Sequence, residues 1–376
     1  MKQLKCSVMA AVILLLTTFM ASCGNTLNDG IQLFSNEDID KYAYGVIYSY
    51  HNVDTVVQLY SSDGTLIRTA NIENVRACGM CSSPGKPYIK HDGYYYFVSD
   101  AAFDTNLKNS VIKLDPKNVR YERIELSMKS GFTYDFSIDT HDNMISSYYS
   151  GQPEWGCVYE TSIKNDENRY YAFNELENFE NVVPADAHFW PLDAIHLEDS
   201  DYFIGYITSP ISGTRTLCII NVKGEYFDIL CSLNGFLYAD GNVCIDNFIY
   251  FSVFDNKDNA KILRYNIQEK KVDASLSLDY QSRDVDIYES DKQLVILNCD
   301  LNYSDQQRKA VYTSKELHIE NTFDIGRPLR IFDFSSNKIV CSDTENIYVY
   351  DLEWNELTTF AIVKEPNMKF SGIFTK

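Results

Sequence analysis

Positive charge is scarce in this sequence, which holds 33 Lys and Arg against 53 Asp and Glu and carries a formal net charge of -20. Nucleic-acid binding needs clustered Lys and Arg that neutralise phosphates. Similar clusters hold proteins on anionic lipid headgroups. The composition therefore argues against a nucleic-acid partner and against a polybasic membrane contact.

Familiar catalytic motifs are also missing. The chain has no G-x-S-x-G, no H-E-x-x-H, no phosphate-binding glycine loop and no dinucleotide fingerprint. The six histidines show no ligand-like spacing. Acidic pairs are too numerous to single out the carboxylate couple of a glycosidase. We therefore expect no cofactor and no metal, and we assign no catalytic residue.

Long apolar segments are confined to the N-terminus. After residue 23 no stretch approaches the roughly 18 apolar residues that identify a transmembrane helix. Before it, Lys2 and Lys5 precede a largely apolar run from Val8 to Met20, which small residues follow. This order is typical of a secretory signal.

Residues 20–23, Met-Ala-Ser-Cys, resemble the lipobox of bacterial lipoproteins, with Met20 where that family prefers Leu. The resemblance implies a signal peptide over residues 1–22 and lipidation of Cys23. Several acyl chains then give stable anchoring in the cell envelope, and we expect an outer membrane lipoprotein facing the periplasm or the surface. Cleavage removes Lys2 and Lys5 but no acid, so the net charge becomes -22. An ordinary signal peptide with an incidental Cys23 is the alternative.

No Pro/Gly/Ser linker divides the rest of the chain, which instead repeats short strands. One series of polar turns precedes aromatic or β-branched strands, at Asp40-Lys41, Asp92-Gly93, Asp142-Asn143, Asp199-Ser200, Asp246-Asn247, Ser290-Asp291 and Ser336-Asn337. A second series of tight turns joins strand pairs that are typical of hairpins, at Asp63-Gly64, Asp115-Pro116, Asn165-Asp166, Lys223-Gly224, Gln268-Glu269, Ser314-Lys315 and Glu353-Trp354.

Four short strands that recur roughly every 40–50 residues are typical of a β-propeller blade. The segment GYYYFVSD (93–100) is similar to the inner-blade strands of NHL-type and TolB-like propellers. Seven units are countable, and families of this kind often have six. We predict an all-β chain: a seven-bladed or six-bladed β-propeller of four-stranded antiparallel blades. The domains are a lipidated N-terminal tether over residues 23–39 and a single propeller over residues 40–376.

The ring needs a strand from the far end of the chain. Residues 24–36 are polar and irregular, so the first unit lacks its innermost strand, while the chain continues after the last unit near Ile362. We predict that Phe370 to Phe374 supplies that strand and closes the ring, which removes two exposed sheet ends.

Cys78 and Cys81 form a C-x-x-C in a connector between strands. The helix that lowers a thiol pKa in thioredoxin-like proteins does not follow, and no second Cys/His pair completes a zinc site. A structural disulfide or a pair of inert thiols is the simplest interpretation, with redox and metal roles as alternatives.

In a propeller, the connections between blades and those between second and third strands share one end of the ring. Here these connections are long and varied, and long loops on a rigid frame often carry function. Planar or forked side chains suit binding of sugars, peptides or proteins, so the candidate ligand-binding residues are Trp155, His188, Trp190, Tyr303 and Arg327. The alternative for the tryptophans is packing between blades.

Four aspartates end the second strand of four units: Asp100, Asp255, Asp300 and Asp343. At the channel mouth they would crowd negative charge, raise some pKa values or attract Ca²⁺. Each one equally suits a turn, where it accepts backbone N–H groups.

The sequence favours a lipid-anchored, non-catalytic binding or scaffolding protein whose long-loop end meets a partner protein, peptide or glycan at the cell envelope. Two alternatives stay open. One is a glycan- or peptide-processing enzyme with carboxylates at the channel mouth. The other is a thiol redox role for Cys78 and Cys81.

Overall fold

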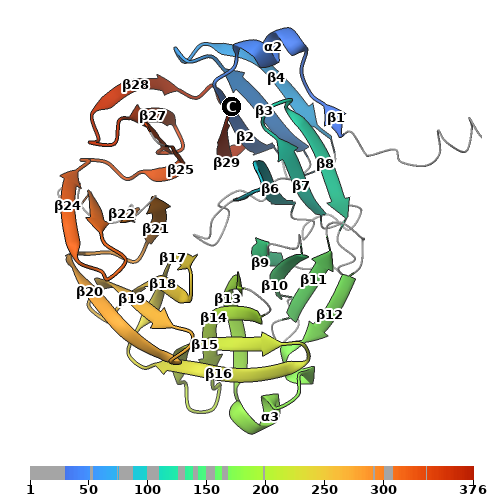
Figure 1. Ribbon diagram of the computed structural model, residues 1–376. Helices are drawn as coiled ribbons and strands as arrows, with labels where there is room; N and C mark the ends of the chain where they lie inside the picture. The colour runs from blue at the N-terminus through green and yellow to red at the C-terminus, as the bar shows by residue number, and fades with distance from the viewer. Residues whose placement is uncertain are drawn as a thin grey trace, which may run out of the picture.

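The computed structural model describes residues 30–50, 54–73, 75, 88–99, 110–125, 132–138, 143–149, 157–162, 168–197, 200–290, 293–299, 308–335 and 337–376. Their strands form seven four-stranded antiparallel units arranged in a ring (Figure 1). The all-β propeller prediction is confirmed, and these seven units agree with the count of seven blades.

From the innermost strand outward, the first blades are built as follows. Blade 1 holds β29 (Met368–Thr375), β2 (Tyr44–Tyr50), β3 (Asp54–Tyr60) and β4 (Leu66–Ile72). Blade 2 holds β5 (Tyr88–His91), β6 (Tyr94–Ser99), β7 (Ser110–Asp115) and β8 (Arg120–Glu125). Blade 3 holds β9 (Phe132–Ile138), β10 (Asn143–Tyr149), β11 (Cys157–Ser162) and β12 (Asn168–Ala172).

The other four blades follow in chain order. Blade 4 holds β13 (His188–Leu197), β14 (Ser200–Thr208), β15 (Arg215–Lys223) and β16 (Tyr226–Leu233). Blade 5 holds β17 (Leu237–Ile245), β18 (Phe248–Phe254), β19 (Asn259–Asn266) and β20 (Lys271–Gln281). Blade 6 holds β21 (Val285–Ser290), β22 (Gln293–Asn298), β23 (Lys309–Thr313) and β24 (Ile319–Asp324). Blade 7 holds β25 (Arg330–Phe334), β26 (Ile339–Ser342), β27 (Asn346–Tyr350) and β28 (Glu356–Ala361).

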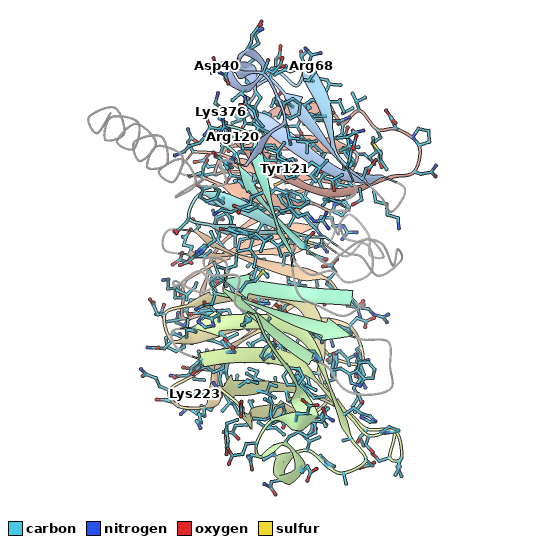
Figure 2. The ribbon with its side chains drawn as sticks, turned by 90° about the vertical axis from the view of Figure 1, so that its right-hand side faces the viewer. Asp40, Arg68, Arg120, Tyr121, Lys223 and Lys376 are labelled. Carbon is cyan, nitrogen blue, oxygen red and sulfur yellow. The ribbon has the colours of Figure 1, made fainter. Side chains whose placement is uncertain are left out.

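A few short elements lie outside the blades. Strand β1 (Ile31–Gln32) pairs with β8 as a fifth, outer strand of blade 2. Helix α2 (Asn36–Lys41) begins at Ser35, whose side chain accepts the Asp38 N–H. The 3₁₀ helix η1 (Phe173–Glu175) and helix α3 (Phe179–Val182) precede blade 4. Residues 31–39 of the predicted tether thus form β1 and most of α2; Asp40 of α2 and Lys223 of β15 lie on opposite sides of the ring (Figure 2).

Several turns lie where the sequence predicts them, whereas Asp40-Lys41, predicted as a turn, forms the end of helix α2. Asp92 and Gly93 have φ of 48° and 78°, which is the left-handed pair of a two-residue hairpin turn between β5 and β6. The described turns of the second series likewise join the third and fourth strands of the blades, and Gly224 follows Lys223, the last residue of β15, in the turn to β16; Asn165-Asp166 lies outside the described residues.

Buried side chains form seven apolar clusters, one between each pair of neighbouring blades. Strands alternate their side chains between two faces, so each blade contributes to two clusters. Blades 4 and 5, for example, share Ile204, Ile219, Ile249 and Phe251, all fully buried. The hydrophobic core therefore consists of the interfaces between neighbouring blades, arranged around the axis of the ring.

Strand β29 closes the ring. It pairs with β2 from Tyr44 opposite Thr375 to Tyr50 opposite Met368, and is the innermost strand of blade 1. Figure 1 shows the red C-terminal strand beside the blue β2. Phe374 is fully buried against Tyr42 and Tyr95. The predicted return of Phe370 to Phe374 to blade 1 is confirmed.

Within the described residues, no helix combines the length and the apolar character that crossing a membrane requires.

Candidate binding site in the central channel

The innermost strands surround a cavity of about 360 Å³. Its wall comes from β5, β9, β13, β17, β21 and β25. Tyr88 of β5 packs against Gly372 of β29 and stacks on Phe332 of β25, with ring centroids 5.9 Å apart. The Tyr88 hydroxyl also donates to the Phe332 carbonyl. These aromatic rings fill the channel beside blade 1, and the cavity lies toward the other blades.

The charged part of the wall is mainly acidic. It includes Asp193, Asp240, Asp286 and Glu289, against the cations Lys90 and Arg330. His196 also lines the cavity, and its Nδ1 is hydrogen-bonded to Asp201. The long-loop end of the ring is the end at which β21 and β25 begin and β22 ends. There the N–H of Cys299, which follows β22, donates to the carbonyl of Asp284, which precedes β21 (2.9 Å).

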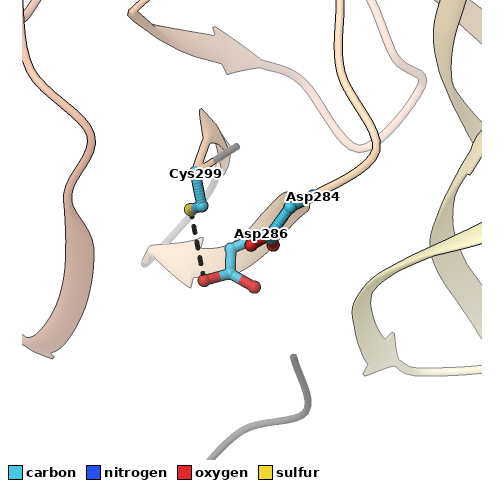
Figure 3. A group of neighbouring side chains, drawn as sticks. All are labelled: Asp284, Asp286 and Cys299. Carbon is cyan, nitrogen blue, oxygen red and sulfur yellow. Dashed lines mark hydrogen bonds between the residues drawn. The ribbon is translucent and has the colours of Figure 1, made fainter. Parts of the chain in front are cut away.

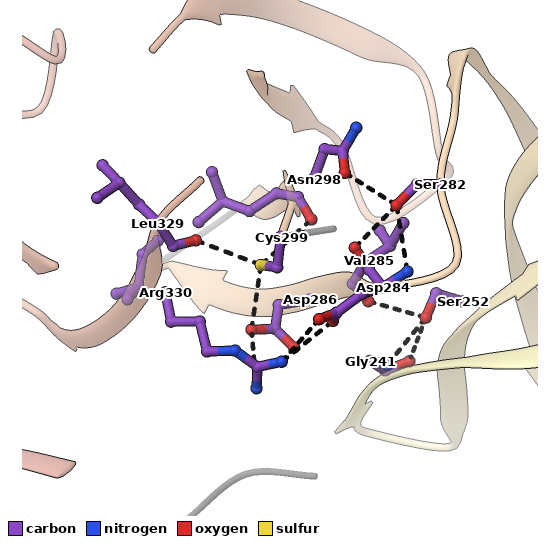
Figure 4. Close-up of polar contacts among 12 residues, drawn as sticks. Gly241, Ser252, Ser282, Asp284, Val285, Asp286, Asn298, Cys299, Leu329 and Arg330 are labelled. Atoms are coloured by element: carbon purple, nitrogen blue, oxygen red, sulfur yellow. Dashed lines mark hydrogen bonds and ion pairs between the residues drawn. The ribbon is translucent and has the colours of Figure 1, made fainter. Parts of the chain in front are cut away.

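Arg330, at the start of β25, is the centre of a polar cluster at that end (Figure 4). Its Nη2 donates to both carboxylate oxygens of Asp284, at 2.9 and 3.2 Å, and its Nη1 lies 3.9 Å from Asp286 Oδ2. Tyr288 donates to Asp286 (2.9 Å) and accepts the Ile331 N–H (3.1 Å). Despite its burial, Arg330 keeps a raised pKa because both aspartates stabilise its charge. The cluster joins blades 6 and 7.

Asp284, Asp286 and Cys299 are the one group with a metal-like arrangement among the described residues, since their ligand atoms lie within 4.8 Å of one another (Figure 3). Cys299 Sγ is 3.4 Å from Asp286 Oδ2 and 3.3 Å from the Leu329 carbonyl oxygen. Burial and the two carboxylates raise the thiol pKa well above its ordinary value, so it keeps its proton. Arg330 already neutralises the carboxylates, so this group does not fit a metal ion.

Two further aspartates of the innermost strands also have protein partners; of these, Asp193 lines the cavity. Asp193 is buried and accepts the hydroxyl of Tyr238, which in turn accepts from Asn242 (2.9 Å). Asp333 accepts from Lys90 (3.0 Å) and from Thr375 Oγ1 (2.8 Å) of the closing strand. Both carboxylates thus link neighbouring inner strands.

Asp240 differs from these residues. Among the described residues, none makes a hydrogen bond or ion pair with its carboxylate, although it lines the cavity. Burial raises its pKa to about 8, and the negative charges of Asp284, Asp193 and Asp286 add to this rise, which Arg330 partly opposes. Its carboxyl group is therefore largely protonated at neutral pH.

The candidate residues from the sequence lie away from the cavity wall wherever the structure describes them. Trp190 of β13 donates from Nε1 to Thr208 Oγ1 (2.8 Å) and packs beside the cluster between blades 4 and 5. His188 is the first residue of β13, opposite Thr208. Arg327 lies over the Tyr348 ring, 4.4 Å from its centroid, with Nη1 3.6 Å from Glu356 Oε2.

Asp255 and Asp343 cap turns. Asp255 Oδ1 accepts the backbone N–H groups of Lys257 (2.8 Å) and Asn259 (3.0 Å). Bonds from the Asn259 side chain and these N–H groups lower the Asp255 pKa. Burial favours a higher pKa for Asp343, but bonds from Tyr348 and from backbone N–H groups outweigh it, and the pKa is lowered. The remaining predicted positions lie outside the described residues: Cys23, Cys78, Cys81, Asp100, Trp155, Asp300 and Tyr303.

The channel aspartates were missed by sequence reasoning, although a signal exists. Asp193, Asp240, Asp286 and Asp333 stand 46 or 47 residues apart, one in each inner strand of blades 4 to 7. In β13, β17 and β25 the pairing register shifts next to this aspartate. Such bulges re-aim a side chain, so an aspartate repeated at blade spacing in the first strand of each unit points to the channel.

No protein-family model and no curated protein matches the chain. Among solved structures, it is similar to BamB from Moraxella catarrhalis, with 10% identity, a TM-score of 0.44, and coverage of 89% of this chain and 97% of that chain. It is also similar to apo AztD from Citrobacter koseri, with 13% identity, a TM-score of 0.49, and coverage of 88% and 97%. A third similar structure is the propeller domain of Myceliophteria thermophila Cps50 (Swd1), with 9% identity, a TM-score of 0.49, and coverage of 77% of this chain and 90% of that chain. Values this low carry no argument about function, and the fold assignment rests on the strand order.

Proposed function

We propose that this protein is a lipid-anchored β-propeller of the cell envelope that binds a partner protein, peptide or glycan, without catalysis, at the long-loop end of its ring. The lipobox-like segment ending at Cys23 supports the anchor. The observation that carries the binding role is the channel cavity of about 360 Å³, which is within the range of ligand sites.

The polar groups of the innermost strands favour binding over chemistry. Arg330 holds Asp284 and Asp286, Tyr238 holds Asp193, and Lys90 holds Asp333. Groups fixed in this way form a rigid frame, because each buried charge already has its partner. A rigid frame that leaves a cavity open is suited to recognising one ligand.

One observation favours the enzyme alternative. Asp240 is protonated near neutral pH beside carboxylates such as Asp193, and a neutral acid paired with an ionised carboxylate is the arrangement of glycosidases. Turnover of a glycan by the wild type that Asp240→Asn abolishes would establish this alternative in place of the binding role.

Site-specific photo-crosslinking tests the binding end. A photoreactive residue replaces Lys257, in the turn between β18 and β19 at the long-loop end, or Lys223, the last residue of β15 before the turn to β16, at the opposite end. Both lysines are exposed, which makes them matched positions. We expect a discrete product in membranes from position 257 and none from position 223. Equal products, or none from position 257, would contradict the proposal.

The anchor is tested separately by replacing Cys23 with Ser. We expect the wild type to remain with membranes washed with salt and without detergent, and the variant to be released, because the acyl chains are lost. Protease accessibility of intact cells then gives the side of the membrane. A Cys23→Ser protein that stays membrane-bound contradicts lipidation at this residue.

A further inference from the structure

The backbone at Asp240 holds its side chain in an unusual place. Asp240 has a φ of 71°, in the middle of an inner strand, where the pairing register shifts between Tyr238 and Asn242. Its neighbour Gly241 leaves no room for a side chain, since a Cβ there would lie 2.0 Å from the Val285 carbonyl oxygen. Left-handed aspartate within a strand is a strained conformation that needs support from its surroundings.

That support comes from Ser252 of the neighbouring strand β18. Its hydroxyl oxygen accepts the Gly241 N–H (2.9 Å), and its one O–H proton faces two carbonyl oxygens, those of Val285 (2.9 Å) and Gly241 (3.1 Å) (Figure 4). Asp240 itself pairs with Val285 of blade 6. The strained bulge is thus fixed from two blades, and the carboxyl group stays at the cavity wall.

The cavity wall combines apolar side chains with charged groups. Apolar side chains make much of the wall, among them Ile195, Val243, Ile287 and Phe332. Of the wall's charged groups, Asp193 and Asp286 accept hydrogen bonds from tyrosines, and Arg330 is held by Asp284, while Asp240 accepts from none of the described residues. The remaining wall carboxylate, Glu289, lies 3.7 Å from Lys315 Nζ. A ligand would therefore meet apolar surface and, at Asp240, a carboxyl group that none of the described residues engages.

We propose that the cavity binds a small organic ammonium ion, a primary amine on a short apolar body, with its ammonium group on the Asp240 carboxylate. This inference rests on the proposed binding role of the cavity and adds a small ligand to the protein, peptide or glycan partner. The surrounding carboxylates give the cavity a negative potential that favours a cation, and an ammonium–carboxylate hydrogen bond is a strong one.

Other occupants suit the site less well. An anion would face Asp193, Asp240 and Asp286 together, while the two cations of the wall, Lys90 and Arg330, already pair with Asp333 and Asp284. A calcium ion takes six to eight oxygen ligands, whereas most carboxylates of the wall are held by protein partners and many of its side chains are apolar. An apolar body of moderate size gains from the aliphatic and aromatic wall, as in most pockets of this volume.

Binding moves a proton. The Asp240 carboxyl group is largely protonated at neutral pH, and the ammonium ion stabilises its ionised form. The ammonium ion keeps its three protons and the carboxyl proton passes to the solvent. Amine binding to this site should therefore release a proton near pH 7 and strengthen as the pH rises toward 8 and 9.

Calorimetry on the purified full chain tests the inference with phenethylamine and, as its uncharged analogue, phenethyl alcohol. Asp240→Asn keeps the shape of the side chain and removes its charge. The matched control is Asp246→Asn in the same blade, because Asp246 is exposed and also has a positive φ, of 53°. If Asp240→Asn does not fold, Asp240→Ser takes its place.

We expect saturable phenethylamine binding, weakened at least about tenfold by Asp240→Asn and unchanged by Asp246→Asn. The heat of binding should differ between phosphate and Tris buffers at pH 7, since a proton is released. Absent binding, equal binding by Asp240→Asn, or equally tight binding of phenethyl alcohol would overturn the inference. If amine binding fails but crosslinking at position 257 persists, the inference is wrong and the proposed function stands. If crosslinking is absent but amine binding is intact, the channel site stands and the proposed long-loop partner does not.

Discussion

At the residue scale, Asp240 and Arg330 show two ways of placing charge inside a channel. Arg330 is 11% exposed and lies between two aspartates that satisfy its guanidinium group. Asp240 has no such partner among the described residues, so burial keeps it protonated. The two residues should therefore respond in opposite ways to neutralising substitutions.

Asp240→Asn should stabilise the protein, with a gain that grows with pH. The folded-state pKa of about 8 lies above the ordinary value of 3.8 for an aspartate, so the wild type loses stability as the pH rises from about 4 to 8. The variant lacks this loss. Urea unfolding of both proteins at pH 5, 6.5 and 8 measures their free energies of unfolding. If the difference between them does not change with pH, or if the variant is less stable at pH 8, Asp240 is not a buried neutral acid.

Arg330→Met should destabilise the protein by about 3–5 kcal/mol at pH 7, because it leaves Asp284 and Asp286 without their cation. The loss should shrink at pH 4, where the carboxylates take up protons. Arg283→Met is the control, since Arg283 is 62% exposed and pairs with Asp258 at the surface, where an ion pair contributes about 0–1 kcal/mol. Equal losses in the two variants would contradict a central role for Arg330.

The site was only partly predictable from the sequence, for reasons visible at these residues. Asp255 and Asp343 have a common local use as turn caps, and the sequence already offers that alternative. Asp240 depends on a bulge fixed by Ser252 and by Val285 of the next blade, which no local pattern encodes. Tertiary contacts decide which repeated aspartate meets the cavity.

At the element scale, the hairpins were predictable because their turn residues have few conformational options. Asp92-Gly93 and Lys223-Gly224 lie where the sequence places turns between strands. Strand β1 and helix α2 were not predicted, since two residues of strand and six of helix carry little periodicity. Their positions depend on the edge of β8 and on a capping serine.

The pairing of β2 with β29 should show strong coupling between Gly45 and Phe374. A Cβ on Gly45 would lie 1.9 Å from the Phe374 ring, so Gly45→Ala should cost at least about 2 kcal/mol. Phe374→Ala should cost about 3–5 kcal/mol, because the ring is fully buried.

The double variant should lose clearly less than the sum of the two, since the new methyl group enters the space that the ring leaves. Chemical denaturation of all four proteins completes the cycle. Additive losses would mean that the two residues do not meet in the folded protein.

At the scale of the whole molecule, seven interfaces share the burial, so no blade is stable by itself. The ring closes through β29, whose last six residues are buried. Removing residues 366–376 exposes β2 and the aromatic rings of Tyr48 and Tyr95, and should lower Tm by well over about 10 °C or prevent folding.

A synthetic peptide of residues 364–376, added to the truncated chain, is the control for this prediction. It should restore much of the lost Tm, because it can pair with β2 as β29 does. Unchanged thermal stability after truncation would show that β29 does not close the ring.

The pairing of Val46 with Ile373 also sets the timing of folding. During synthesis, β2 leaves the ribosome long before residues 368–375 are made. Its inner edge therefore stays unpaired while more than 300 further residues are added. Contacts this distant in sequence form slowly, and an unfinished wheel exposes a sheet edge that can aggregate. For the export proposed above, this delay would be useful, since a polypeptide that cannot complete its native structure early stays threadable through a translocation channel.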